Sequence, residues 1–409
     1  MRGKLLGDLE KIFADPKGTE GQRLSAANAF ADYAASDIAK LSQLLTVATP
    51  EQYSVLNPLV ATNPSPTTVE EISKIAATLP EAELGSVERV PFGRPRANAA
   101  VTLMRLGERE KVLHVFDMTD DPEALTQFIF RCRPRGVGID ALLDMLQLIV
   151  ESKGSTIIPT RSVSEGKSSN ASARYALLLA IGEFTLNEIP ESRRDPFLKQ
   201  LSDTYRHDPS SGVHGATGWL LRQWGQADVV REVDQTPEPY SLDREWFTLA
   251  ITVTPKSPPK PIVKPGKEKG ELESEPEPPV EPLPRKTFHY TFIVFPSGSS
   301  EIGSVADEPD PQKDELRHAV TLTRPFALLD REVTMEELIA FEPEYARYMK
   351  QYDAGICGYV PLSRDPQNEH VENNPPVSHR GMLTFILATI ERPHGKPPVL
   401  HRGQLTVVT

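Results

Sequence analysis

The sequence predicts a mainly α-helical first half followed by a small α+β module. Apolar residues recur at helical spacing as far as about residue 233, whereas apolar and polar residues alternate from residue 287 onward. Between these parts the composition changes abruptly to proline, lysine and glutamate. The three observations together predict two structured regions joined through a polar segment.

Length and charge limit the classes of protein. A chain of 409 residues is expected to form roughly two or three domains. The 45 basic and 57 acidic residues leave a net charge of −12, which argues against binding to nucleic acid or to an anionic membrane. The sequence has no apolar run of about 18 residues and no signal peptide at its amino terminus, so we expect a cytoplasmic protein.

Several helices are predicted before residue 233. Helical stripes of apolar residues occur around 24–34, 139–150 and 175–182, and a further helix is predicted to start at Pro95. The clearest stripe consists of Ile139, Leu142, Leu143, Leu146, Ile149 and Val150. Strand-like alternation is almost absent here, so this region is predicted to be all-α.

The last two predicted helices have the clearest boundaries. One is predicted to open at Asp195-Pro196, and the next is capped by the turn from Asp208 to Ser211 and ends at Gly225. Two tryptophans, Trp219 and Trp224, lie on opposite flanks of the second helix. We expect one to be in the core and the other to face a groove.

The order of residues in this second helix resembles that of a known repeat. The residues concerned are Asp208, Val213, His214, Ala216 and Leu220. They resemble the second helix of a HEAT repeat, although His214 stands where that family usually has arginine. Residues 21–33 and 94–106 echo the pattern more weakly. The resemblance implies that residues 1–233 form an irregular HEAT-like α-solenoid, with a compact helical bundle as the alternative.

One segment interrupts the helical region. Residues 153–170 are rich in serine, glycine and threonine, which predicts an inserted surface loop. The sequence Glu165-Gly166-Lys167-Ser168 ends like a phosphate-binding loop, but Arg161 occupies the position where the first glycine is needed. The loop interpretation is therefore favoured.

Two predicted strands flank the polar segment. Residues 240–253 are expected to form an entry strand, and the alternation from Phe288 to Val294 predicts a second, half-buried strand. Residues 254–286 lie between them and are predicted to be a disordered insertion or linker, because ten of residues 253–286 are proline. If the two strands pair, this segment is an insertion within one hairpin.

Residues 287–379 carry a second resemblance. Their motif residues, in order, are Gly303, Glu315, His318, Val320, Glu332, Val333, Thr334, Phe341, Pro376 and Val377. This order resembles the opening third of the formylglycine-generating enzyme (sulfatase-modifying factor) family. The resemblance implies the amino-terminal part of a C-type-lectin-like α+β module, in which His318 and Glu315 have structural roles. In bacterial multidomain members of the family, a kinase and then HEAT-like helices precede this module in the chain.

The resemblance fails where that family's catalysis begins. The paired cysteines that hold copper in the generating enzymes, and the histidines that hold iron in relatives, have no counterpart here. We therefore expect no catalytic residue and no cofactor, and we interpret residues 380–409 as an atypical tail produced by a frameshift or truncation.

Few other residues suggest chemistry. His370, Glu372 and His379 are candidates for a facial metal site, but no regular element fixes their spacing, and a solvated loop is favoured. Cys132 is predicted to be at the end of a packed helix, and Cys357 is predicted to be a half-buried thiol.

The sequence thus favours a non-catalytic scaffold with a truncated sulfatase-modifying-factor-like module. Because the chain is acidic, its helical domain is expected to bind a protein or peptide partner, and to favour basic segments of that partner. One alternative is a component of a formylglycine-generating or non-haem-iron oxidase-type enzyme that works with a separately encoded remainder. Another is a fragment of a larger kinase-linked protein.

Overall fold

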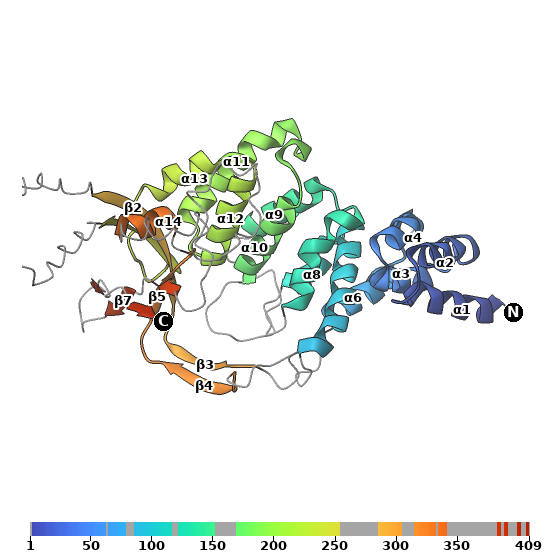
Figure 1. Ribbon diagram of the computed structural model, residues 1–409. Helices are drawn as coiled ribbons and strands as arrows, with labels where there is room; N and C mark the ends of the chain where they lie inside the picture. Colours follow the sequence, from blue (N-terminus) through green and yellow to red (C-terminus); the bar gives the residue numbers. More distant parts are fainter. Residues whose placement is uncertain are drawn as a thin grey trace, which may run out of the picture. The chain divides into compact units, whose positions relative to one another are not determined.

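The chain is seen in a computed structural model (Figure 1). The described residues are 2–62, 64–78, 86–116, 122–151, 169–253, 285–304, 315–332, 334–341, 383–385, 388–391, 399–401 and 406–408. They divide into two compact units, which are described separately below. Unit 1 comprises residues 1–230 with 299–320, and unit 2 comprises residues 231–298 with 321–409.

Unit 1 is built from helices. They are α1 (Arg2–Ala14), α2 (Glu20–Tyr33), α3 (Ile38–Val47), α4 (Pro50–Thr62), α5 (Pro66–Ala77), α6 (Ser86–Arg105), α7 (Arg109–Val112), α8 (Glu123–Arg131), α9 (Ile139–Glu151), α10 (Ser169–Gly182), α11 (Glu191–His207) and α12 (Ser211–Gln223). Three 3₁₀ turns, η1 (Leu113–Phe116), η2 (Arg133–Arg135) and η3 (Leu186–Glu188), lie between them, and α13 (Ala227–Asp234) spans the boundary between the units. Among the described residues, no helix is both long enough and apolar enough to cross a membrane.

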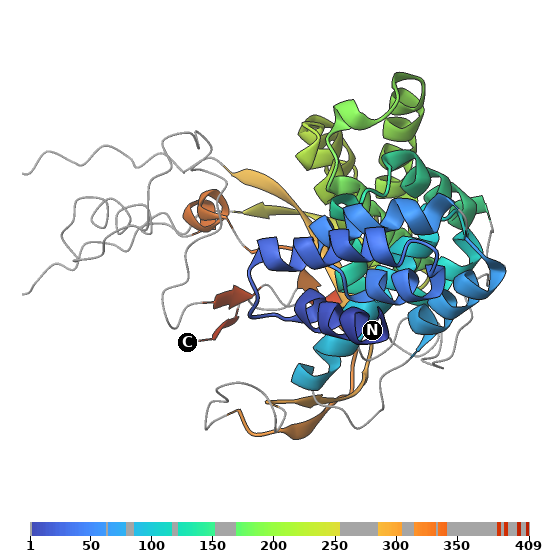
Figure 2. The same cartoon turned by 90° about the vertical axis from the view of Figure 1, so that its right-hand side faces the viewer.

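Helices of unit 1 pack mainly against helices close to them in the chain (Figures 1 and 2). Helix α6 packs against α3, α5 and α8, while α10 packs against α8, α9 and α12. Each helical pair therefore buries its apolar stripes against the pair before it and the pair after it. The coarse prediction of an all-α first region is confirmed.

The first hairpins share one apolar core. Phe13 of α1 and Phe30 of α2 meet edge to face with ring centroids 5.9 Å apart, and both are fully buried. The Gln52 side chain of α4 donates to the carbonyls of Phe13 and Arg23, at 2.9 Å and 3.2 Å. These two hydrogen bonds connect α4 to the end of α1 and to the first turn of α2.

Buried polar side chains close the end of α3. Asn98 donates to the Thr46 carbonyl at 2.7 Å, and Arg135 donates to the Ala48 carbonyl at 2.7 Å. The last carbonyls of a helix have no partner inside the helix, so these donors satisfy groups that burial would otherwise leave unbonded. The donors lie on α6 and η2, so these hydrogen bonds connect the end of α3 to both of those elements.

Two helix starts differ from the prediction. Helix α6 begins at Ser86 rather than at Pro95, and α11 begins at Glu191 rather than at Asp195-Pro196. Proline favours a helix start only as a local preference, and tertiary packing overrides it here. In α6, the chain before Pro95 packs so closely that a side chain at Gly93 would overlap Glu123 of α8.

Unit 2 contains an antiparallel sheet. Its strand order is β1 (Trp246–Val253), β2 (Lys286–Phe295), β5 (Phe326–Leu329), β7 (Ala388–Glu391) and β8 (Val399–His401). Helix α14 (Met335–Phe341) follows β5 in the chain, and β6 (Leu383–Phe385) pairs with β9 (Thr406–Val408). A further pair is formed by β3 (Gly298–Ile302) and β4 (His318–Leu322), most of whose residues are counted with unit 1. The prediction of a small strand-containing module is therefore confirmed in this coarse form.

The two predicted strands around the polar segment do pair. Strand β1 runs antiparallel to β2, with Trp246 opposite Ile293 and Val253 opposite Lys286. One face of this hairpin buries Phe247, Tyr290 and Phe292, and the rings of the two phenylalanines stack 5.2 Å apart. The proline-rich segment is therefore an insertion within one hairpin, and residues 254–284 themselves lie outside the described part.

Candidate functional site

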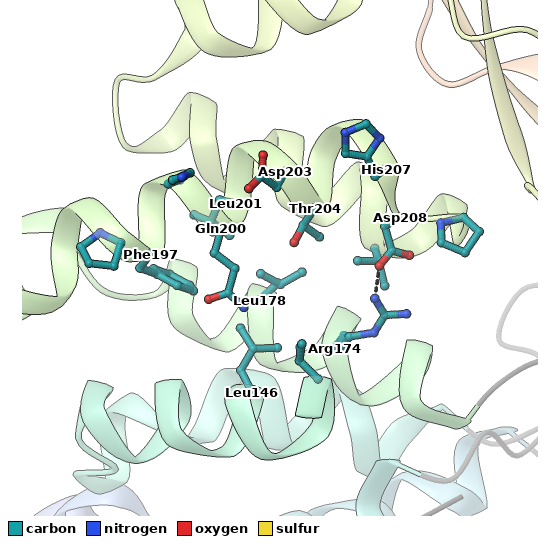
Figure 3. Close-up of a pocket in the computed structure, with 15 residues that line it drawn as sticks. Leu146, Arg174, Leu178, Phe197, Gln200, Leu201, Asp203, Thr204, His207 and Asp208 are labelled. Atoms are coloured by element: carbon teal, nitrogen blue, oxygen red, sulfur yellow. Dashed lines mark hydrogen bonds and ion pairs between the residues drawn. The ribbon is translucent and has the colours of Figure 1, made fainter. Parts of the chain in front are cut away.

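A groove in unit 1 is a candidate site among the described residues (Figure 3). It encloses about 540 Å³ and is bounded by α9, α10, α11 and the start of α12. Its apolar lining consists of Leu146, Val150, Leu178, Phe197, Leu201 and Val213. Helix α9 packs against α10, and α11 packs against α12, which itself packs against α10, so the groove is the space left between successive hairpins.

Polar side chains from α11 occupy one wall of the groove. Gln200 and Thr204 extend from α11 toward Leu146 and Leu178. Their spacing of four residues puts them on one face of the helix, one turn apart. An amide and a hydroxyl among aliphatic side chains supply donors and acceptors without adding a net charge.

One ion pair lies at the end of the groove. Arg174 of α10 donates to the carboxylate of Asp208, which also accepts a hydrogen bond from the Ser210 amide at 3.0 Å. The Asp208 side chain is only 6% exposed and that of Arg174 is 21% exposed. Burial lowers the pKa of Arg174, but the guanidinium remains charged at neutral pH. This pair fixes the α11–α12 turn against α10.

The same local pattern places Arg174 and His214. Ala173-Arg174-Tyr175-Ala176 in α10 has the spacing of Val213-His214-Gly215-Ala216 in α12. Arg174 thus occupies in α10 the place that His214 occupies in α12. Our sequence reasoning missed Arg174, although comparing these two segments would have found it.

A smaller hollow adjoins the groove. It measures about 180 Å³ and shares Leu146, Phe197 and Gln200 with the larger groove. Arg193 lies at its rim and pairs with Asp140 at 3.0 Å and with Asp144 at 2.9 Å. These ion pairs connect α9 to α11 beside the opening, so the groove continues along both helices.

Two of the predicted motif residues lie together near the β3–β4 pair. Gly303 has φ +111°, and a Cβ there would come within 2.5 Å of the Leu316 carbonyl oxygen, so only glycine fits. The next residue, Ser304, donates from its amide to the Glu315 carbonyl at 2.9 Å and from its hydroxyl to the Glu315 carboxylate at 2.8 Å. These contacts hold the end of β3 against the segment that leads into β4.

His318 is the first residue of β4, the strand that pairs with β3. Its ring is exposed, and Nδ1 lies 2.7 Å from the Leu316 carbonyl, two residues earlier in the same segment. The short distance along the chain makes this local bond easier to form than a bond to the neighbouring strand. Val320 in β4 is half-buried.

The predicted Glu-Val-Thr motif begins α14. Thr334 and Glu337 form a reciprocal cap: the Thr334 amide donates to Glu337 at 2.7 Å, and the Glu337 amide donates to the Thr334 hydroxyl at 3.3 Å. Arg331 donates to both Glu337 carboxylate oxygens, at 3.0 Å and 2.5 Å. Glu332 is exposed, and Phe341 is the last residue of α14.

The Glu337 carboxylate is buried, and its titration reflects two opposing effects. Burial raises its pKa, but the hydrogen bonds from Arg331 and the Thr334 amide, together with the charge of Arg331, lower it by more. The pKa of Glu337 therefore lies below its ordinary value. The Arg331–Glu337 ion pair thus lies at the start of α14, beside the Glu-Val-Thr motif.

Other predicted residues lie outside the described part. They are Val333, Cys357, His370, Glu372, Pro376, Val377 and His379. Within the described ranges, no group of three histidine, cysteine, aspartate or glutamate side chains is arranged to hold a metal ion. Cys132 is fully buried at the end of α8, as predicted, and burial raises the pKa of its thiol.

Comparison of the chain with known families, curated proteins and solved structures found no match in any of the three. The resemblances to HEAT repeats and to sulfatase-modifying factors therefore stay predictions.

Proposed function

We propose that the protein is a non-catalytic, cytoplasmic scaffold whose helical region is an irregular HEAT-like solenoid and whose groove between α9 and α11 binds an amphipathic helix of a partner. The observation that carries the proposal is the groove itself, an open channel with an aliphatic floor between two successive hairpins. The neighbour-to-neighbour packing of the helices supports the solenoid. The strand-containing module belongs to this proposal as a truncated relative of sulfatase-modifying factors.

The lining of the groove indicates the chemistry of its occupant. The positive charge of Arg174 is balanced by the negative charge of Asp208. Lys199 and Asp203 also line the groove, and their charges are opposite in sign, so these four side chains together carry no net charge. Affinity must therefore come from apolar anchors, as when one face of an amphipathic helix lies in a hydrophobic groove. The net charge of −12 favours a partner whose exposed face is basic, because unlike charges steer the encounter.

A binding assay tests the groove directly. The probe is a fluorescein-labelled 14-residue amphipathic helix with leucines on one face and lysines on the other, and fluorescence anisotropy is measured against the full chain. We expect saturable binding that Gln200→Trp weakens at least tenfold, because the indole fills the groove. Asp195→Trp is the matched control, since Asp195 is exposed on α11 and does not line the groove.

Two results would overturn the proposal. Equal binding by wild type and Gln200→Trp would show that the probe does not use the groove. Copper or iron retained at about one equivalent by the purified chain, together with aldehyde formation on a sulfatase-type cysteine peptide, would favour the enzyme alternative instead.

A further inference from the structure

Helices α10 and α12 lie side by side and run in the same direction. The Trp219 ring of α12 covers Gly182 so closely that a Cβ at Gly182 would overlap it. At the other end, a Cβ at Gly212 would lie 3.6 Å from the Tyr175 ring of α10. The amino-terminal part of α10 thus contacts the amino-terminal part of α12, and the carboxy-terminal parts of the two helices also contact each other.

Two aromatic rings stay exposed on this pair of helices. Tyr175 is 37% exposed and Trp219 is 38% exposed, and neither lines the groove described above. Gly215 is exposed on α12 between Gly212 and Trp219, and a Cβ there would meet no described atom within 4 Å. We call Tyr175, Gly215 and Trp219 the aromatic shelf.

The two helices that form the aromatic shelf carry positive charge and no acidic residue. Their charged side chains are Arg174, which Asp208 compensates, and Arg222, which is exposed one turn after Trp219. Within the described part of the chain, Arg222 has no ion pair. On these two helices, the charge that no described ion pair compensates is therefore the positive charge of Arg222.

From this surface we infer that the aromatic shelf binds an acidic, proline-rich segment of a partner protein. Exposed Trp and Tyr rings are the surfaces on which the proline rings of a polyproline II helix pack, and such a helix loses little entropy on binding. The bare backbone at Gly215 leaves room for the peptide between the two rings. Arg222 forms a charge-assisted hydrogen bond with a glutamate of the segment. The occupant differs in charge from the one proposed for the groove, so the two sites are independent.

Three matched peptides test this inference in 0.15 M salt. They are fluorescein-labelled four-fold repeats of Glu-Pro-Pro, Lys-Pro-Pro and Glu-Ser-Ser, titrated against the full chain. The first repeat is expected to bind at least tenfold more tightly than either of the others, because only it combines proline with negative charge. Equal or tighter binding of the Lys-Pro-Pro or the Glu-Ser-Ser repeat overturns the inference.

Variants assign the binding to the aromatic shelf. Trp219→Ala and Arg222→Glu should each weaken binding at least tenfold. Gly215→Gln should do the same while keeping the fold, since it adds a better helix former in open space. Gln200→Trp, which blocks the groove, should leave binding unchanged. Binding that survives both Gly215→Gln and Arg222→Glu would refute the site.

Discussion

Arg174 on α10 and Asp208 at the α11–α12 turn form an ion pair across 34 residues of sequence. Asp208 also accepts the Ser210 amide, so one carboxylate both shapes the turn and joins it to the preceding hairpin. Since both side chains border the groove, the pair also sets how far α12 stands from α10 at that end.

Removing the Asp208 charge should destabilise unit 1. Asp208→Asn leaves the largely buried Arg174 without its counter-charge, and we expect a loss of about 2 kcal/mol in the free energy of unfolding. Urea denaturation followed by circular dichroism measures this loss.

A double-mutant cycle separates this pair from the turn geometry. The variant Arg174→Met with Asp208→Asn should be less destabilised than Asp208→Asn alone, because no uncompensated guanidinium remains. Additive losses in the two single variants would mean that the two side chains do not interact.

Trp219 and Gly182 provide a second test. Gly182→Ala should displace the Trp219 ring and cost about 1–3 kcal/mol, because a Cβ has no room there. The matched control is Gly215→Ala, which should stabilise the protein by up to about 1 kcal/mol, because alanine is the better helix former in open space. Thermal unfolding compares the two variants, and a neutral Gly182→Ala would contradict the packing.

Local features of this region were predictable from sequence. The turn in which Asp208 accepts the Ser210 amide, and Gly225 with φ +73° just beyond the end of α12, follow from rules that act over a few residues. The prediction for the two tryptophans is confirmed in part: Trp224 is 7% exposed and lies in the core, whereas Trp219 is 38% exposed but does not line the groove. Helical spacing alone decides which flank each ring occupies.

Features that depend on distant partners were not predictable. The groove needs two successive hairpins in their final positions, and the Arg174 contact needs a residue 34 positions away. The starts of α6 and α11 were placed wrongly at Pro95 and Pro196 because helix propensity gave way to packing.

Acid should weaken unit 2 through Glu337. Its pKa in the folded state lies below the ordinary 4.5, so the stability that it contributes is complete above about pH 4.5 and is lost as pH falls through the lower folded value. Glu337→Gln should therefore destabilise the unit near pH 7 and reduce the difference in stability between pH 7 and pH 3. Hydrogen exchange of peptides from β1 and β2 reports on this unit, and an unchanged pH dependence would contradict the assignment.

The insertion within the β1–β2 hairpin allows a final prediction. Val253 lies opposite Lys286, so replacing residues 254–285 by Asn-Gly gives a two-residue turn in the observed register. Shortening the loop from 32 residues (285 − 254 + 1) to two removes four doublings of length, which should stabilise the hairpin by about 2 kcal/mol.

A Gly-Ser loop of the original length is the control for that change and should leave stability unaltered. Hydrogen exchange of Trp246–Val253 and Lys286–Phe295 measures the effect. Loss of protection in the Asn-Gly variant would show that the register depends on the inserted segment. Retained or increased protection would mean that Phe247, Tyr290 and Phe292 hold the two strands together by their own packing.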